Sequence, residues 1–360
     1  MHRRFQLAAA ALSSMHSVRH RSQVGFISVW IVITAALFAQ STAHAHHSPS
    51  NYDHRRNVTI TGTVVRLEWA NPHVYTYVEQ VTDAGKMVWQ IEGLPPALLR
   101  RMGWHRDTLR VGDVISVTGS PAKNPNSTGL FPRLIKRGES TLFALNEVPK
   151  LAAQKAATRA NGLNGVWSTP FTSVAQIGSP PAATLTAQGA EASRHYDEKT
   201  SPTSNCIPLP APSWMFIPEL KRITVGADAI DIESESAGAR RIHLDISSHE
   251  GAIPSIQGHS IGKWEGKTLV VDTTHFAYHG AGNGGGSGIG PGLPSSTRKH
   301  LIERFTPGAD GTSLTYSYEV IDREYLAVPR TGSVQFTHDP PAKFEVERCS
   351  LETARRFIEE

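Results

Sequence analysis

The chain has 360 residues, and its 36 lysines and arginines against 32 acidic side chains give a formal net charge of +4. This excess comes from the amino-terminal segment, since residues 1–45 hold four arginines and no acidic residue. The balanced charge of the remainder argues against a general electrostatic surface for nucleic acid or anionic membranes. We therefore expect neither as a partner.

The amino-terminal segment has the order of an export signal. Arg19 and Arg21 precede a mostly apolar stretch over residues 24–39, and the small residues Ala43 and Ala45 follow it. Signal peptides show this order, and the apolar stretch is short for a membrane span. We expect residues 1–45 to be a signal peptide and the mature protein to be periplasmic or secreted, without a stable membrane span.

Histidines stand at both expected cleavage points. Cleavage after residue 45 leaves His46-His47 at the start, where the terminal amine and an imidazole can chelate together, as in the histidine brace of copper proteins. Cleavage after residue 43 leaves His44-Ala45-His46, which resembles the amino-terminal Cu(II)- and Ni(II)-binding motif. We expect copper as a cofactor, with His46, His47 and His73 as metal ligands. The alternative is a solvated terminus that is merely rich in histidine.

Residues 46–148 are expected to form the first domain, a small OB-like β-barrel with one short helix. Alternating β-branched runs predict strands over residues 58–69, 74–78, 87–91, 113–119 and 134–145. A helix is predicted over residues 94–102, because Pro95-Pro96 suits a first turn and Gly103 suits the stop. The OB likeness is one of shape and does not imply nucleic-acid binding.

Several motifs occur in this domain: His46-His47-Ser48, Tyr52-Asp53, Glu68-Trp69, Asn71-Pro72-His73 and Val111-Gly112-Asp113. On these motifs, residues 44–145 resemble an uncharacterised family of exported bacterial proteins with a His-His-Ser mature start and an Asn-Pro-His motif. The resemblance implies secretion and a shared fold, and it implies no activity.

An alanine-rich, polar segment over residues 149–164 is expected to link the first domain to a second one as a short helix. The second domain, residues 165–360, is expected to be an antiparallel β-barrel or sandwich, lipocalin-like. Strands are predicted over residues 222–225, 229–234, 241–246, 267–273, 299–305, 312–320 and 343–347. The interior would hold either a small apolar ligand or a packed core.

The chain has two cysteines, Cys206 and Cys349. In an oxidising compartment an even pair favours a disulfide. The alternative is two free thiols, because the spacing in sequence does not show that the two residues approach each other.

Two short motifs of the second domain match enzyme signatures in an unsuitable context. Residues 258–262, Gly-His-Ser-Ile-Gly, match G-x-S-x-G, but a strand is predicted after them where a nucleophile elbow needs a helix. Residues 280–285, Gly-Ala-Gly-Asn-Gly-Gly, match G-x-G-x-x-G without a helix after them. We expect the second motif to be a flexible surface loop.

Residues 258–266, Gly-His-Ser-Ile-Gly-Lys-Trp-Glu-Gly, lie among the further blocks 241–245, 269–273 and 300–305. On these blocks the second domain resembles another uncharacterised exported β-rich domain, without an assigned activity. Residues two apart on a strand share a face. The candidate catalytic group is therefore His243, Asp245, His259, His300 and Glu303, and the alternative is a buried polar network that fixes the barrel.

Three functions remain open from the sequence. The leading one is a periplasmic binding protein that takes copper at its mature amino terminus and a small apolar ligand in the second domain. The second is a hydrolase or acid–base enzyme on an apolar substrate, with His259 or His300 as base and Asp245 or Glu303 as orienting carboxylate. The third is an envelope scaffold that docks other proteins.

Overall fold

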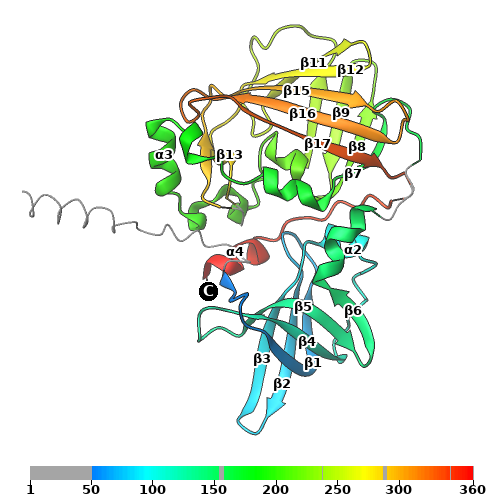
Figure 1. Ribbon diagram of the computed structural model, residues 1–360, viewed down its shortest axis with the longest axis vertical. Coiled ribbons are helices and arrows are strands. Elements are labelled where there is room, and N and C mark those ends of the chain that lie inside the picture. Colours follow the sequence, from blue (N-terminus) through cyan, green and yellow to red (C-terminus); the bar gives the residue numbers. More distant parts are fainter. Residues whose placement is uncertain (1–50, 154–157, 237, 287–289, 341, 360) are drawn as a thin grey trace, which may run out of the picture. The chain divides into compact units, whose positions relative to one another are not determined.

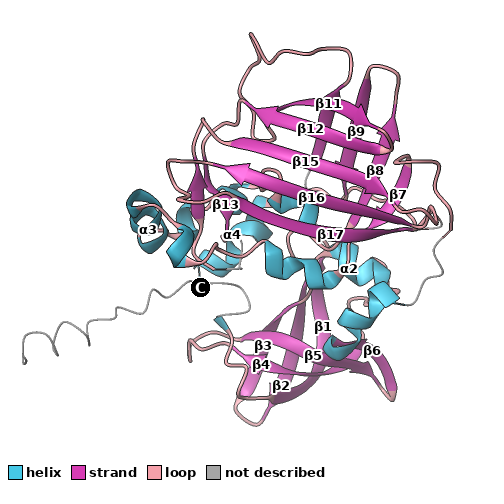
Figure 2. Cartoon of the chain, turned by 45° about the horizontal axis from the view of Figure 1, so that its top comes forward, coloured by secondary structure: helices cyan, strands magenta, loops and turns pink. Residues whose placement is uncertain are grey.

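The computed structural model describes residues 51–153, 158–236, 238–286, 290–340 and 342–359, and their regular secondary structure is mostly β-strand. They form two closed barrels, which are coloured by residue number in Figure 1 and by secondary structure in Figure 2. The expected signal peptide and part of the expected linker lie outside the described residues. No described helix is long and apolar enough to cross a membrane.

The N-terminal barrel has five strands in the order β3-β2-β1-β4-β5, and it closes because β3 also pairs with β5. A sixth strand, β6, extends the sheet beyond β5. Its elements are β1 (Val58–Glu68), β2 (Tyr75–Thr82), β3 (Gly85–Glu92), α2 (Pro96–Arg101), β4 (Val114–Pro121), β5 (Gly129–Arg137), β6 (Ser140–Ala144) and the 3-10 helix η2 (Leu145–Ala153). The expected small barrel with one short α-helix is confirmed.

Local chemistry explains the boundaries of this domain. Helix α2 begins at Pro96, whose missing N–H has no role in a first turn, and it buries Leu98 and Leu99. The single strand predicted over residues 134–145 is two strands, because Gly138 turns the chain between them with a φ of +58°.

The C-terminal barrel closes through nine strands in the order β10-β11-β12-β15-β16-β17-β7-β8-β9. All neighbours are antiparallel except β10 and β11, which are parallel. The strands are β7 (Gly165–Ser168), β8 (Leu220–Val225), β9 (Ala229–Ser234), β10 (Gly238–His243), β11 (His259–Glu265), β12 (Thr268–Thr274), β15 (His300–Pro307), β16 (Ser313–Ile321) and β17 (Arg330–His338). Closure makes the fold a barrel, and the alternative of a sandwich is wrong.

Shorter elements lie between the barrel strands. They are η3 (Phe171–Gln176), η4 (Ala182–Thr184), α3 (Ala187–Arg194), η5 (Glu198–Thr200), η6 (Pro202–Asn205), η7 (Ser213–Phe216), β13 (His279–Gly284) and β14 (Leu293–Ser295). Strands β13 and β14 pair with each other in a separate two-stranded sheet.

The lumen of the C-terminal barrel is filled by the chain itself. Trp214, Met215 and Phe216 of η7 are fully buried. The ring of Phe216 lies 5.7 Å from that of Tyr316 and 5.5 Å from that of Tyr318, two residues on the predicted buried face of β16. The described residues of the lumen therefore form a packed, largely apolar core.

The chain ends in a segment, residues 342–359, that contacts both barrels (red in Figure 1). Cys349 forms the expected disulfide with Cys206, with 5.8 Å between their Cα atoms. Helix α4 (Leu351–Glu359) follows, and Arg356 lies with its guanidinium 4.9 Å from the ring centre of Tyr75 on β2. The strand predicted over residues 343–347 is wrong, because these residues run without strand pairing toward the N-terminal domain.

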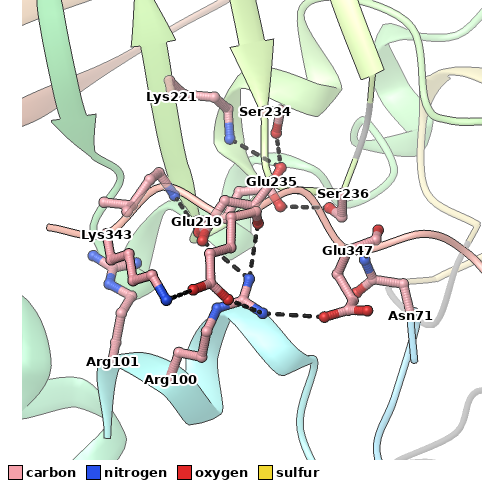
Figure 3. A network of polar contacts seen from close by, with 12 residues as sticks. Asn71, Arg100, Arg101, Glu219, Lys221, Ser234, Glu235, Ser236, Lys343 and Glu347 are labelled. Carbon is pink, nitrogen blue, oxygen red and sulfur yellow. Dashed lines mark hydrogen bonds and ion pairs between the residues drawn. The ribbon is translucent and has the colours of Figure 1, made fainter. Parts of the chain in front are cut away.

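Charged side chains join α2 to the C-terminal barrel (Figure 3). Arg100 binds Glu235 at 3.1 Å and Glu347 at 3.2 Å, while Arg101 donates to the carbonyl oxygen of Pro218 at 3.1 Å. Burial lowers the pKa of Arg101, although the nearby acidic groups oppose this. The contact between the two domains is thus strongly polar.

Candidate functional site

Polar side chains gather on the outer face of the C-terminal barrel. His243, His259, Asp272 and His300 stand on β10, β11, β12 and β15, which are neighbours in the barrel. Each of the four is partly exposed and stands next to a buried residue in the sequence. Because adjacent residues on a strand point to opposite faces, all four side chains point outward. The structure brings three of the five predicted catalytic residues together on this face.

A chain of hydrogen bonds connects this group through a residue that the sequence analysis missed, His249. His259 Nδ1 lies 2.8 Å from His249 Nδ1, and His249 Nε2 lies 3.0 Å from Asp272 Oδ1. The other oxygen of Asp272 lies 2.8 Å from His300 Nε2. The carboxylate of Asp272 thus contacts the imidazoles of His249 and His300, and the imidazole of His249 also contacts that of His259.

The carboxylate of Asp272 determines where the protons lie along this chain. A carboxylate only accepts hydrogen bonds, so His249 and His300 each carry a proton on Nε2. In neutral His249 the Nδ1 atom is then an acceptor, and His259 donates to it from its own Nδ1. The remaining lone pair of neutral His259 is on Nε2 and that of neutral His300 is on Nδ1, so the chain has a basic nitrogen at each end.

Two further histidines flank the chain. The ring of His243 stacks on that of His259 with centres 5.1 Å apart, and the ring of His275 stacks on that of His249 at 6.0 Å. Burial lowers the pKa of His259, and His249, His243 and His275 lower it further. Asp245 Oδ1 lies 3.8 Å from His243 Nδ1, beyond hydrogen-bond distance. We call His243, His249, His259, His275, His300 and Asp272 the histidine cluster.

Glu303 does not belong to this cluster, although it was predicted with it. It lies inside the barrel, where Arg240 donates to it at 2.7 Å and the Tyr316 hydroxyl donates at 2.8 Å. His300 and Glu303 are three residues apart on one strand and therefore face opposite sides. Glu303 is part of a buried network, as the alternative interpretation expected.

Ser260 of the G-x-S-x-G motif is also inside the barrel and is 1% exposed. Its Oγ accepts a hydrogen bond from Arg240 Nε at 3.0 Å and another from Thr273 at 3.1 Å. Residues 259–262 of the motif lie within strand β11, and its histidine faces the other side of the sheet. Ser260 therefore lacks the elbow, the base and the access that a nucleophile needs.

The glycine-rich motif over residues 280–285 is not the surface loop that we expected. Most of these residues are buried, and residues 280–284 belong to β13. A Cβ atom at Gly282 would overlap Ser295, and one at Gly284 would overlap Arg330. Close packing, rather than phosphate binding, explains these two glycines.

A second site is centred on His73 in the N-terminal domain. His73 Nδ1 lies 2.5 Å from Glu92 Oε1, and the Tyr52 hydroxyl donates to Glu92 Oε2 at 2.8 Å. His73 comes just before β2, and Glu92 ends β3 opposite the first residue of β2, which explains their proximity. Since Glu92 accepts, neutral His73 carries its proton on Nδ1 and its lone pair on Nε2.

No group of three or more histidine, cysteine or acidic side chains is arranged to hold a metal ion in the part of the chain that the structure describes. In the histidine cluster, His249 and His300 direct ring nitrogens at Asp272, and His249 directs the other at His259. His46 and His47 lie outside the described residues. Of the three predicted metal ligands, His73 is therefore the one whose surroundings the structure describes.

Sequence patterns could have found one of the missed residues of the cluster. Asp272 stands on a predicted strand and alternates with the buried Val271 and Thr273. His249 lies in an irregular segment where no periodicity indicates the direction of a side chain.

Comparison with known proteins gives a likeness to a family over part of the chain and no activity. No curated protein matches the chain. Residues 35–132 match the model of a family of unknown function (DUF6152), so that the N-terminal part of the chain resembles an uncharacterised family.

Proposed function

We propose that this protein is an exported binding protein that holds copper through its mature amino terminus and His73. The observation that carries the proposal is the hydrogen bond from His73 to the buried carboxylate of Glu92. Metal-binding histidines almost always donate their second ring N–H to a carboxylate, a carbonyl or water. Glu92 fixes the orientation and tautomer of His73 in the way that a metal ligand requires.

The reach of the chain supports the same proposal. Tyr52 binds the carboxylate that also binds His73, and His46 is six residues before Tyr52. An extended chain spans about 3.5 Å per residue, so these six residues can cover about 20 Å. The terminal histidines therefore have ample length to meet His73.

The donor types favour copper. A terminal amine and imidazole nitrogens suit Cu(II), which prefers a square arrangement of nitrogen ligands. Export would place the terminal amine and the disulfide in an oxidising compartment. The apolar ligand considered from the sequence is not part of this proposal, because side chains fill the lumen of the barrel.

The test begins with the protein purified from the periplasm of an expressing bacterium. Its intact mass should show a chain that starts at His44 or His46. Titration with Cu(II), followed by electron paramagnetic resonance, should then give one bound ion per chain with nitrogen ligands. A protein that retains residues 1–45, or that binds no copper at stoichiometry, would contradict the proposal and favour the scaffold alternative.

Variants distinguish a copper site that includes His73 and Glu92 from copper binding by the amino terminus alone. His73→Ala should weaken copper binding, and Glu92→Gln should weaken it by about 10–100-fold, the usual effect of losing a supporting carboxylate. His195→Ala is the matched control, because His195 is an exposed residue after α3 that pairs with Glu191 and lies outside both sites. Equal affinity in all three variants would indicate binding by the terminus alone.

The histidine cluster favours a second candidate, an acid–base enzyme. Asp272 and His249 orient His259, whose Nε2 is then the proton acceptor, in the way that a carboxylate and a histidine cooperate in general-base catalysis. Relative to the expectation from sequence, the orienting carboxylate is Asp272 in place of Asp245 or Glu303.

A panel of p-nitrophenyl esters with apolar acyl groups tests this second candidate. Turnover should be lost in His259→Gln, reduced in Asp272→Asn and retained in His195→Gln. Turnover that survives in both His259→Gln and His300→Gln would remove the enzyme hypothesis for this site.

A further inference from the structure

An irregular surface segment of the C-terminal domain, residues 245–254, is anchored to the barrel at its middle by the side chain of His249. Most of its residues are exposed, whereas the side chain of His249 is only 19% exposed. His249 bonds to His259 on β11 and to Asp272 on β12. Ala252 and Glu250 donate hydrogen bonds within the segment, and Asp245 at its start lies 3.8 Å from His243 on β10.

The two ends of the segment are held independently of His249. The backbone N–H of Leu244 donates to the carbonyl oxygen of Asp228 at 2.8 Å. Beyond the segment, Ser255 donates to the carbonyl oxygen of His275 at 3.0 Å and accepts from Ala277 at 2.7 Å. Loss of the His249 contacts would therefore free only the residues between these two points.

The contact between His249 and His259 tolerates one added proton but not two. The two Nδ1 atoms are 2.8 Å apart, so one proton must lie between them. A proton added at His259 Nε2 leaves that hydrogen bond intact and strengthens it. A second proton, on His249 Nδ1, would place two N–H groups and two positive charges face to face.

The surroundings of the pair mostly oppose the second proton. The ring of His275 packs against His249, and that of His243 packs against His259, so these rings add repulsion when they are protonated. Asp272 opposes this effect, but it also binds His300. The remaining charged groups on neighbouring elements are Asp231 on β9, Arg241 on β10, Asp245 after β10 and Glu250 on the segment itself, of which Asp231 and Arg241 pair with each other.

We propose that the His249–His259 contact is a pH-sensitive latch, in which a second proton releases residues 245–254 from the outer face of the barrel. The released segment carries two large apolar side chains, Ile246 and Ile253, of which Ile253 is already 84% exposed. Release also uncovers His259 and Asp272. The proposal depends on neither the copper site nor the enzyme hypothesis, since it concerns only the contacts of His249.

Hydrogen–deuterium exchange of the purified protein, read by mass spectrometry, tests the latch. Exchange of residues 245–254 is compared at about pH 7.5 and about pH 5, values that bracket an ordinary imidazole pKa, after correction for the intrinsic exchange rate. We expect exchange in this segment to rise by about tenfold or more at the lower pH, since each pH unit is a factor of ten in proton binding. Strands β11 and β12 should keep their protection.

Three variants identify the origin of the change. His249→Ala should show fast exchange of the segment at both pH values. His259→Asn should keep the segment protected at both, because its amide can donate to His249 or accept from it without titrating. His195→Asn, a change at an exposed histidine outside the cluster, should behave as the unaltered protein does.

Each result has a definite consequence. Equal corrected exchange at the two pH values in the unaltered protein would overturn the latch. So would protection that persists in His249→Ala, or acid release that persists in His259→Asn. Circular dichroism of each variant verifies that the barrel is folded.

Discussion

Arg240 and Glu303 form an ion pair inside the lumen of the C-terminal barrel, with Arg240 Nη1 2.7 Å from Glu303 Oε1. Both side chains are at most 1% exposed. Withdrawing each charge from water costs several kcal/mol, so that the pair is tolerated only because each charge has its partner. Thr273 and the Tyr316 hydroxyl complete the hydrogen bonding around it.

Removing one partner of this ion pair should destabilise the protein more than replacing both partners by apolar side chains. Glu303→Gln leaves the guanidinium of Arg240 buried without a counter-charge and should lower the free energy of unfolding by about 3–5 kcal/mol. The double variant Arg240→Met with Glu303→Leu should lose much less, because no charge remains in the lumen. Urea unfolding at neutral pH measures both, and an equal loss in the two proteins would contradict this account.

Ser260 should prove structural. Ser260→Ala removes the hydroxyl that accepts from Arg240 and Thr273, and it should lower the free energy of unfolding by about 1–3 kcal/mol. It should leave unchanged any turnover that depends on His259, because the two side chains face opposite sides of β11. Selective loss of turnover in a folded Ser260→Ala protein would restore the hydrolase hypothesis for this motif.

Strands were predictable from sequence where apolar side chains mark the inner face. On β16, Leu314, Tyr316, Tyr318 and Val320 point inward, as their alternation predicts. Strand β11 was missed because its inward positions are Ser260 and Gly262, while its outward ones are His259 and Ile261. The network of Arg240 explains the serine, and a Cβ atom at Gly262 would lie 2.8 Å from Ile242 and 3.1 Å from Leu269.

The histidine cluster was predictable only in part. Alternation places His259, Asp272 and His300 on the outer face once their strands are known. It also separates Glu303 from His300, since three residues on a strand reverse the direction of the side chain. His249 reaches the cluster through the path of an irregular segment, which depends on tertiary contacts that no local pattern encodes.

Lys299 should make stability depend on pH in the alkaline range. It is fully buried, donates to the carbonyl oxygens of Ala211 and Gly282 at 2.7 and 2.8 Å, and lies 4.6 Å from the ring centre of Phe276. Burial lowers the pKa of Lys299 to about 7. An unfolded lysine has a pKa of about 10.4, so between these two pKa values the unfolded chain binds a proton that the folded one does not.

The sign of the effect follows from this difference. Where the unfolded state binds more protons, stability rises with pH, so Lys299 should raise the free energy of unfolding between about pH 7 and about pH 10 by several kcal/mol. Lys299→Met cannot titrate and should flatten this slope. Urea unfolding between these pH values measures the slope in the unaltered protein and in Lys299→Met. Parallel pH profiles of the two proteins would show that Lys299 keeps an ordinary pKa.

The disulfide between Cys206 and Cys349 should stabilise the C-terminal segment and its contacts with both domains. It closes a loop of 143 residues, for which the chain-entropy model gives about 5 kcal/mol. Replacing both cysteines by serine should therefore lower the free energy of unfolding by about 2–5 kcal/mol.

The local effect of that change should fall on residues 342–359. Besides the disulfide, hydrogen bonds hold the segment to the N-terminal domain. Asn71 donates to the carbonyl oxygen of Glu347 at 2.6 Å, and Ser350 donates to the carbonyl oxygen of Asn71 at 3.0 Å. Arg100 and Arg106 also pair with Glu347, and Arg356 pairs with Glu68, whereas Cys349 itself is exposed. Hydrogen exchange of residues 342–359 should accelerate in the double serine variant before the barrels unfold, whereas unchanged exchange would mean that Asn71 and Arg356 hold the segment unaided.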